Sequence, residues 1–95
     1  MNDAFAKPYL EVSTYVEEGS ITVKVNGQVI LKASGHGQCT WFINQAGSQA
    51  MTWEVQGTGG TEYRISVASP NSAAFYLTKT LNRHGYDFMT TQLNV

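Results

Sequence analysis

Apolar and polar residues alternate along most of the chain, which is the pattern of β-strands that bury one face. The alternation is clearest over residues 51–67, where two arms flank the glycine-rich run 57–61. Because glycine bends readily, this segment predicts a β-hairpin whose apolar face forms the centre of the core. The residues predicted for the core are Val12, Val23, Trp41, Trp53, Val55, Tyr63 and Ile65.

The same alternation predicts further strands on either side of this segment. Residues 9–16 and 21–25 are predicted as two strands joined by a turn at 17–19. Asn26-Gly27 is a strong signal for a two-residue hairpin, with residues 28–33 as its return arm. A loop is predicted over 34–37, a strand over 38–44 and a final strand over 86–95, and residues 1–8 are expected to form a flexible arm.

Residues 71–83 fit two interpretations. Ser69 and Pro70 resemble a helix start, and Gly85 suits the position just past a helix end, so a short helix over 71–83 is favoured. The same segment also alternates as a strand, with Phe75 and Leu77 on one face, and that alternative stays open.

Six or seven short strands with frequent turns predict a mainly β fold, an antiparallel β-sandwich of immunoglobulin-like architecture. A strongly bent sheet capped by one helix is the alternative. The spacing from Cys39 to Trp53 resembles the cysteine-to-tryptophan spacing of immunoglobulin domains. The second cysteine of that pattern and its nearby tyrosine are absent, so the resemblance implies architecture alone.

The chain length and charge narrow the function classes. With 95 residues the chain is expected to be one β-rich domain, and its net charge of −1 with scattered basic residues argues against nucleic-acid binding. No apolar run is long enough for a membrane span and no signal peptide is recognisable. A cytoplasmic protein is therefore the default expectation, with signal-free export or virion association left open.

Two polar pairs have metal-ligand residue types, His36-x-x-Cys39 and His84-x-x-Asp87. Cys39 shares the alternation phase of Trp41, so it is interpreted as a packed side chain and not as a reactive thiol. The histidines are interpreted as loop residues. We therefore expect no metal, no other cofactor and no enzymatic activity.

The remaining candidates are aromatic residues that alternate outward from the apolar faces. Tyr9, Tyr15, Phe42 and Tyr76 are predicted as binding residues, because such rings suit protein contacts or sugar stacking. The leading hypothesis is a non-catalytic interaction protein of inhibitor, immunity or virion-accessory type, which binds one protein partner or itself through a β face or edge strand. A carbohydrate-binding module is the alternative, and a small metal-dependent or thiol enzyme is the third.

Self-association is expected because strand edges with few charges are poorly protected against pairing. The first strand, 9–16, and the last strand, 86–95, are the predicted edges, and the outward tyrosine face of the first strand is the other candidate interface. We therefore predict a homodimer.

Overall fold

The computed structural model describes residues 9–95, which form a six-stranded antiparallel sheet. The strands are β1 (Tyr9–Val25), β2 (Gln28–Phe42), β3 (Ser48–Gly57), β4 (Glu62–Ser69), β5 (Phe75–Thr80) and β6 (Tyr86–Asn94). One 3-10 turn, η2 (Asn71–Ala73), lies between β4 and β5, and these residues contain no α-helix. The arm predicted for residues 1–8 lies outside the described residues.

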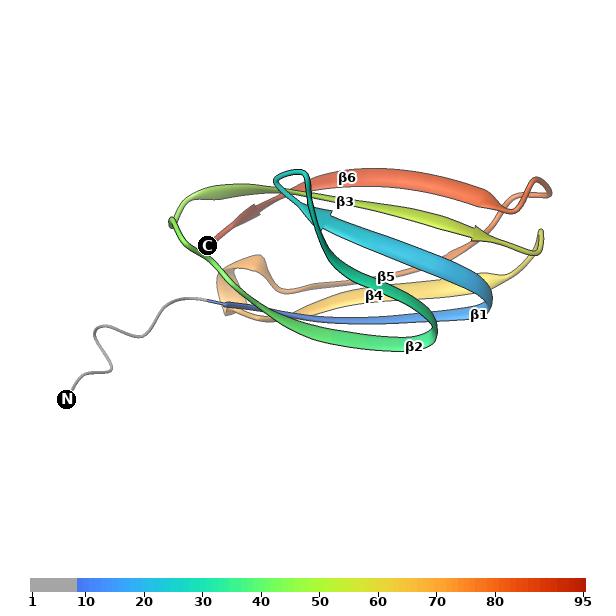
Figure 1. Cartoon of the computed structure of the whole chain (residues 1–95), viewed down its shortest axis with the longest axis horizontal. Helices are drawn as coiled ribbons and strands as arrows, with labels where there is room; N and C mark the ends of the chain where they lie inside the picture. Colours follow the sequence, from blue (N-terminus) through green and yellow to red (C-terminus); the bar gives the residue numbers. More distant parts are fainter. Residues whose placement is uncertain (1–8) are drawn as a thin grey trace.

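Strand β1 organises the sheet because it pairs on both of its edges. Along one edge it pairs with β2 over nearly its whole length. Along the other edge, residues 11–16 pair with β4 and residues 19–25 pair with β3. Strand β5 extends the sheet beyond β4, and β6 extends it beyond β3. The sheet therefore curls until β3 and β6 lie over β4 and β5, and the β1–β2 hairpin folds across from one layer to the other (Figure 1).

This arrangement confirms the predicted class, a mainly β antiparallel domain. Because all six strands are hydrogen-bonded into a single curled sheet, the structure is a half-barrel. It shares with an immunoglobulin sandwich only the mainly β, antiparallel class.

The bend in β1 corrects the turn predicted at residues 17–19. Val16 and Ile21 are both fully buried. In a regular strand they would lie on opposite faces, because side chains alternate and four residues separate the two. The pairing register with β2 shifts between Val16 and Ser20, so an irregularity inside a continuous strand restores the inward phase. The loop predicted at 34–37 is likewise part of β2, which bends beside β1.

The bend depends on two glycines that lie backbone to backbone. A Cβ atom on Gly19 would overlap the carbonyl oxygen of Gln56, and one on Gly57 would overlap the carbonyl oxygen of Glu18. Gly19 also has a φ of +153°, in the region that favours glycine. Thus β1 can leave β4 and join β3 only where neither backbone carries a side chain.

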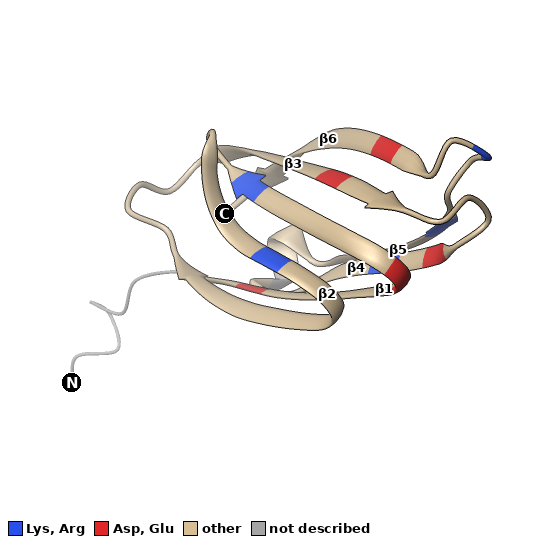
Figure 2. Cartoon of the chain, turned by 45° about the vertical axis from the view of Figure 1, so that its right-hand side comes forward, with Lys and Arg blue, Asp and Glu red and all other residues tan. Residues whose placement is uncertain are grey.

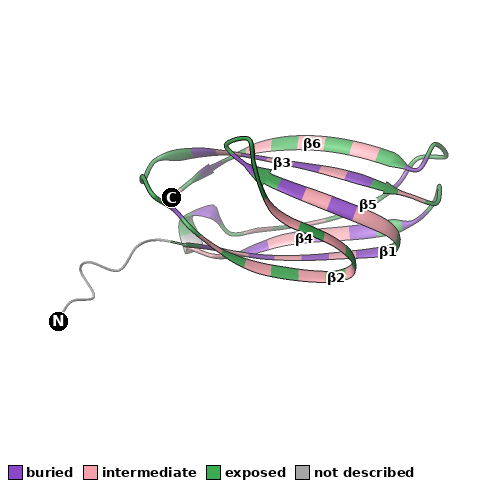
Figure 3. Ribbon diagram, in the orientation of Figure 1, coloured by how far each residue is buried: buried purple, intermediate pink, exposed green. Residues whose placement is uncertain are grey.

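The core lies between the two layers and is made mainly by the inward positions of β1, β3, β4 and β6, with partly buried side chains of β2 and β5 packed against it (Figure 3). The prediction is confirmed for Val12, Val23, Trp53, Val55, Tyr63 and Ile65, which are all buried. It is wrong for Trp41, which is only half-buried and packs at the margin of the core.

The hairpin prediction over residues 51–67 is wrong about which strands pair, but it is correct about which side chains are buried. Strands β3 and β4 both pair with β1 and form no ladder with each other. Residues 58–61 therefore connect the two layers of the half-barrel, with a hydrogen bond from the Thr58 N–H to the Glu18 carbonyl at 3.0 Å. The alternation predicted the buried faces correctly, because it does not depend on which strand is the neighbour.

The helix predicted over residues 71–83 is also wrong. Only Asn71–Ala73 form a helical turn, and Phe75–Thr80 pair with β4 as strand β5. Phe75 stacks against the Trp53 ring, with centroids 6.0 Å apart. Its side chain therefore points inward, as the strand interpretation of this segment predicts. Packing onto the core therefore outweighs the helix-end signals of Ser69, Pro70 and Gly85.

The glycine contact at the bend leads to a stability prediction. Gly57→Ala should lower the free energy of unfolding by about 3 kcal/mol, because its Cβ meets backbone that cannot turn aside. Gln56→Ala, an exposed change at the neighbouring position of β3, is the control and should cost under about 0.5 kcal/mol. Urea denaturation followed by tryptophan fluorescence measures both. Equal midpoints for the two variants would contradict the close approach.

Candidate functional site

The four predicted binding residues share one surface, the outer aromatic face. We define it as the outward side of the layer made by the N-terminal half of β1, the C-terminal half of β2, β4 and β5. Phe42 and Tyr76 are 57% and 66% exposed there, and Tyr9 is 38% exposed. The outward orientation predicted from alternation is confirmed for these three rings. Their role in binding stays a prediction.

Tyr15 lies on the same face but is covered by its neighbours. Its register partners are His36 on β2 and Arg64 on β4. The His36 ring is tilted against Tyr15 with centroids 4.6 Å apart, and the Arg64 guanidinium lies 4.7 Å from the Tyr15 centroid. Arg64 is also 3.8 Å from the Glu62 carboxylate. The flanks of Tyr15 are thus occupied within the chain, which makes it a poor platform for a stacking sugar.

The remaining rings do not form one platform. Tyr9 is opposite Phe42, with centroids 5.9 Å apart and planes tilted by 56°. Tyr76 lies on β5, opposite Ser66 of β4, which in turn is opposite Ser13 of β1. Two strand spacings of about 4.8 Å therefore separate Tyr76 from β1.

The outer edge of β2 lies beside the Tyr9–Phe42 pair. This strand has 15 residues and pairs only with β1 among residues 9–95. Its side chains with inward phase, among them Leu31, Cys39 and Trp41, are only partly buried. A long strand with backbone groups available along one side is therefore adjacent to exposed aromatic rings.

The observed strand pairing corrects one of the two strand edges predicted for self-association. The first strand, predicted as an edge, is hydrogen-bonded on both sides and is the central strand of the fold. The last strand is an edge as predicted, since β6 pairs only with β3 in the described part of the chain. The sequence does not reveal that β2 is an edge, because alternation cannot orient its adjacent apolar residues Val29, Ile30 and Leu31.

The structure does not bring the two metal-ligand pairs together. His36 contacts Tyr15 on the outer face, whereas Cys39 packs against the core from the opposite face of β2. Burial raises the pKa of the Cys39 thiol, which favours its uncharged form. His84 lies in the turn between β5 and β6. Residues 9–95 contain no cluster of three or more His, Cys, Asp or Glu side chains arranged to hold a metal ion.

Asp87 instead belongs to a polar network between the two layers, which the sequence analysis missed. The Tyr63 hydroxyl donates to Asp87 Oδ2 at 2.5 Å and accepts a hydrogen bond from Trp53 Nε1 at 3.3 Å. Lys79 Nζ lies 3.2 Å from the same Asp87 oxygen and 3.4 Å from Met89 Sδ. Since Lys79 is on β5 and Asp87 is on β6, the ion pair joins the two strands at the open side of the half-barrel.

The network shifts the ionisation of both acidic groups. Burial, followed by the hydrogen bond to Asp87, raises the pKa of the Tyr63 hydroxyl above its usual range. For Asp87, burial favours the neutral acid, but hydrogen bonds from Tyr63 and Lys79 outweigh it and lower the pKa of the carboxyl. A neutral tyrosine and an ionised aspartate are therefore the stable pair at neutral pH. The network therefore links β4, β5 and β6 through hydrogen bonds and one ion pair.

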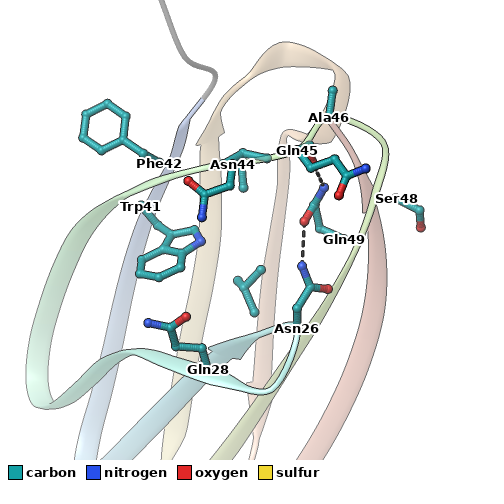
Figure 4. Close-up of a pocket in the computed structure, with 11 residues that line it drawn as sticks. Asn26, Gln28, Trp41, Phe42, Asn44, Gln45, Ala46, Ser48 and Gln49 are labelled. Atoms are coloured by element: carbon teal, nitrogen blue, oxygen red, sulfur yellow. Dashed lines mark hydrogen bonds between the residues drawn. The ribbon is translucent and has the colours of Figure 1, made fainter.

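A polar cleft at the opposite end of the molecule was also missed. It has a volume of about 470 Å³ and is formed by the β1–β2 turn, the end of β2, and the segment from Ile43 into the start of β3 (Figure 4). Its lining includes Trp41 and a group of amides: Asn26, Gln28, Asn44, Gln45 and Gln49. These amides come from separate segments and follow no period, so alternation could not reveal them. The amide-rich run 44–49 was the only available signal.

Comparisons of this chain with protein-family models, with curated proteins and with solved structures find no match. Among residues 9–95 there is no helix of the length and hydropathy needed to cross a membrane.

The Asp87 network leads to a prediction about pH. Because the folded-state pKa of Asp87 is lowered, its contribution to stability is present above the unfolded-state pKa near 3.8 and is lost as pH falls through the folded-state value. Asp87→Asn should cost about 1–2 kcal/mol at pH 7, and the difference from the native chain should narrow below about pH 4.

Urea denaturation from pH 7 to pH 2 measures this difference. Glu62→Gln, which changes an exposed ion pair, is the control and should leave the pH dependence nearly unchanged. A constant gap between Asp87→Asn and the native chain across this range would show that the ionised carboxylate does not stabilise the fold.

Proposed function

We propose that this chain is a non-catalytic interaction protein that binds through the free edge of β2, pairing with a second copy of itself or with one protein partner. The observation that carries the proposal is the 15-residue strand whose outer edge pairs with no other strand in the described part of the chain. Unpaired N–H and C=O groups along such an edge can accept an added strand.

The edge of β2 differs from the other two edges of the sheet. Strands β5 and β6 are shorter, and side chains from both meet in the Lys79–Asp87 ion pair, which links one edge to the other. Strand β2 has no such partner among residues 9–95. It is therefore the longest edge with open backbone groups.

The edge also has few of the features that prevent pairing. Natural proteins protect such edges with charged residues and proline. Over its whole length β2 contains one lysine, Lys32, with no acidic residue and no proline. The small net charge of the chain adds little repulsion between copies.

Side chains beside the edge suit an interface. Phe42 lies at the end of β2 and packs against Tyr9, and both rings are exposed on the outer aromatic face. Aromatic residues are enriched in the cores of protein interfaces. A strand added to β2 would supply backbone hydrogen bonds, and these rings would add apolar contact next to it.

Antiparallel pairing of β2 with β2 of a second copy gives a closed two-fold dimer, in which both copies use the same surface. We expect this dimer at tens of micromolar protein, and sedimentation equilibrium measures it against the monomer mass of 10.4 kDa. The double variant Gln38→Lys/Thr40→Lys places positive charges on exposed positions of β2 and should weaken the dimer at least tenfold.

The matched control is Gln56→Lys/Gln92→Lys, which adds the same charge at exposed positions of β3 and β6. It should leave the dimer unchanged, because β3 and β6 lie on the other side of β1 from the outer edge of β2. A native chain that stays monomeric at this concentration would refute pairing between copies. Equal weakening by both variants would refute the β2 edge as the interface.

A further inference from the structure

The cleft beside Trp41 has the composition of a ligand site and is formed partly by β2, with Gln28 at the start of that strand and Trp41 and Phe42 at its end. Figure 4 shows the Trp41 ring between the amides of Gln28 and Asn44, with Gln49 and Asn26 on the opposite side of the opening. Its volume of about 470 Å³ falls within the range of small-molecule sites. We propose that this cleft binds a neutral carbohydrate, with Trp41 as the stacking platform and the amides as hydroxyl partners.

One side of the cleft is held in place by hydrogen bonds. Asn26 Nδ2 donates to Gln49 Oε1 at 2.7 Å, and Asn26 Oδ1 accepts from the Ala50 N–H at 2.9 Å. Gln49 Nε2 donates to the Gln45 carbonyl at 2.8 Å, and Gln49 is only 5% exposed. These bonds fix the β1–β2 turn against the start of β3, so the cleft is largely formed before any ligand arrives.

The other amides are directed to solvent. Gln28, Asn44 and Gln45 are all exposed, and each amide offers a donor and an acceptor in fixed relation. Adjacent hydroxyls of a sugar ring present the same combination of donor and acceptor. The side chains that hold the cleft and those available to a ligand are thus different residues.

Charge determines the class of ligand. None of the described residues that line this cleft is acidic or basic. Figure 2 shows the same for the connection from β2 to β3, which has no Lys, Arg, Asp or Glu. Phosphorylated and carboxylated ligands favour cationic partners, and the lining that residues 9–95 supply offers none. A neutral ligand rich in hydroxyls, with one apolar face for the Trp41 ring, fits the lining.

Trp41 is also placed to act as a platform. It is half-buried, so its ring is anchored at the margin of the core while part of it remains open to the cleft. Trp53, in contrast, is 3% exposed and hydrogen-bonded to Tyr63. Of the two tryptophans, Trp41 is therefore the one whose fluorescence should respond to a bound sugar.

The test is a titration of the native chain with four neutral probes: cellohexaose, maltohexaose, mannohexaose and chitohexaose in its N-acetylated form. Tryptophan fluorescence and amide NMR shifts follow binding. We expect saturable binding of at least one probe, with shifts confined to the β1–β2 turn, the end of β2 and residues 43–49. Trp41→Ala should weaken binding at least tenfold.

A second variant protects the test against misfolding. Asn44→Ala changes an exposed loop side chain and should weaken binding about fivefold, as expected for one lost hydrogen bond. Tyr76→Ala, on the exposed side of β5, should bind as the native chain does. The β2 double variant Gln38→Lys/Thr40→Lys should also retain sugar binding, so loss of dimerisation and loss of the sugar site are separate outcomes.

Three results would overturn the sugar site. The first is the absence of saturable binding to all four probes at 10 mM. The second is binding that Trp41→Ala and Asn44→Ala leave unchanged. The third is a set of NMR shifts around Tyr9 or Tyr76 with none around the cleft, which would place the sugar elsewhere on the outer aromatic face.

Discussion

The fold depends on a single strand edge that serves two layers. Strand β1 gives one half of this edge to β4 and the other half to β3, so each layer of the half-barrel is attached to it. The change of partner requires the backbones at Gly19 and Gly57 to meet without side chains. Gly85 extends the same contact, since a Cβ there would overlap the Gly57 carbonyl. The bend of β1 and the connections from β3 to β4 and from β5 to β6 meet at this end of the molecule, and glycine is the residue that lets them approach.

The same constraint determines which surfaces are left for binding. With both edges of β1 in use, the edges that remain among the described strands are those of β2, β5 and β6. The last two are linked by the Lys79–Asp87 ion pair and lie beside the stacked rings of Trp53 and Phe75. The open backbone of the described residues is therefore concentrated on β2, the strand on which both proposals rely.

Alternation in the sequence predicted which side chains face inward but not which strands pair. Val16 and Ile21 keep an inward phase only if the chain either turns or is irregular between them, and a single sequence does not distinguish the two. The glycine-rich run 57–61 is likewise compatible with a hairpin and with a connection between layers. In residues 75–80, the inward phase of Phe75 was visible, but its contact with Trp53 exists only after folding. Pairing is decided by tertiary contacts, which local patterns do not contain.

In the candidate sites, too, the sequence predicts what one strand determines and does not predict what depends on its neighbours. The outward orientation of Tyr9, Phe42 and Tyr76 could be predicted, because orientation is a property of one strand. The covering of Tyr15 by His36 and Arg64 could not, because it depends on neighbours from two other strands. The amides of the Trp41 cleft come from segments that only the folded chain brings together. Trp41 is predicted for the core, but its ring stays partly open because the rest of the described chain covers β2 incompletely. The free edge and the cleft thus have a common origin: among residues 9–95, β2 is hydrogen-bonded on one side only, and its inward side chains are only partly buried.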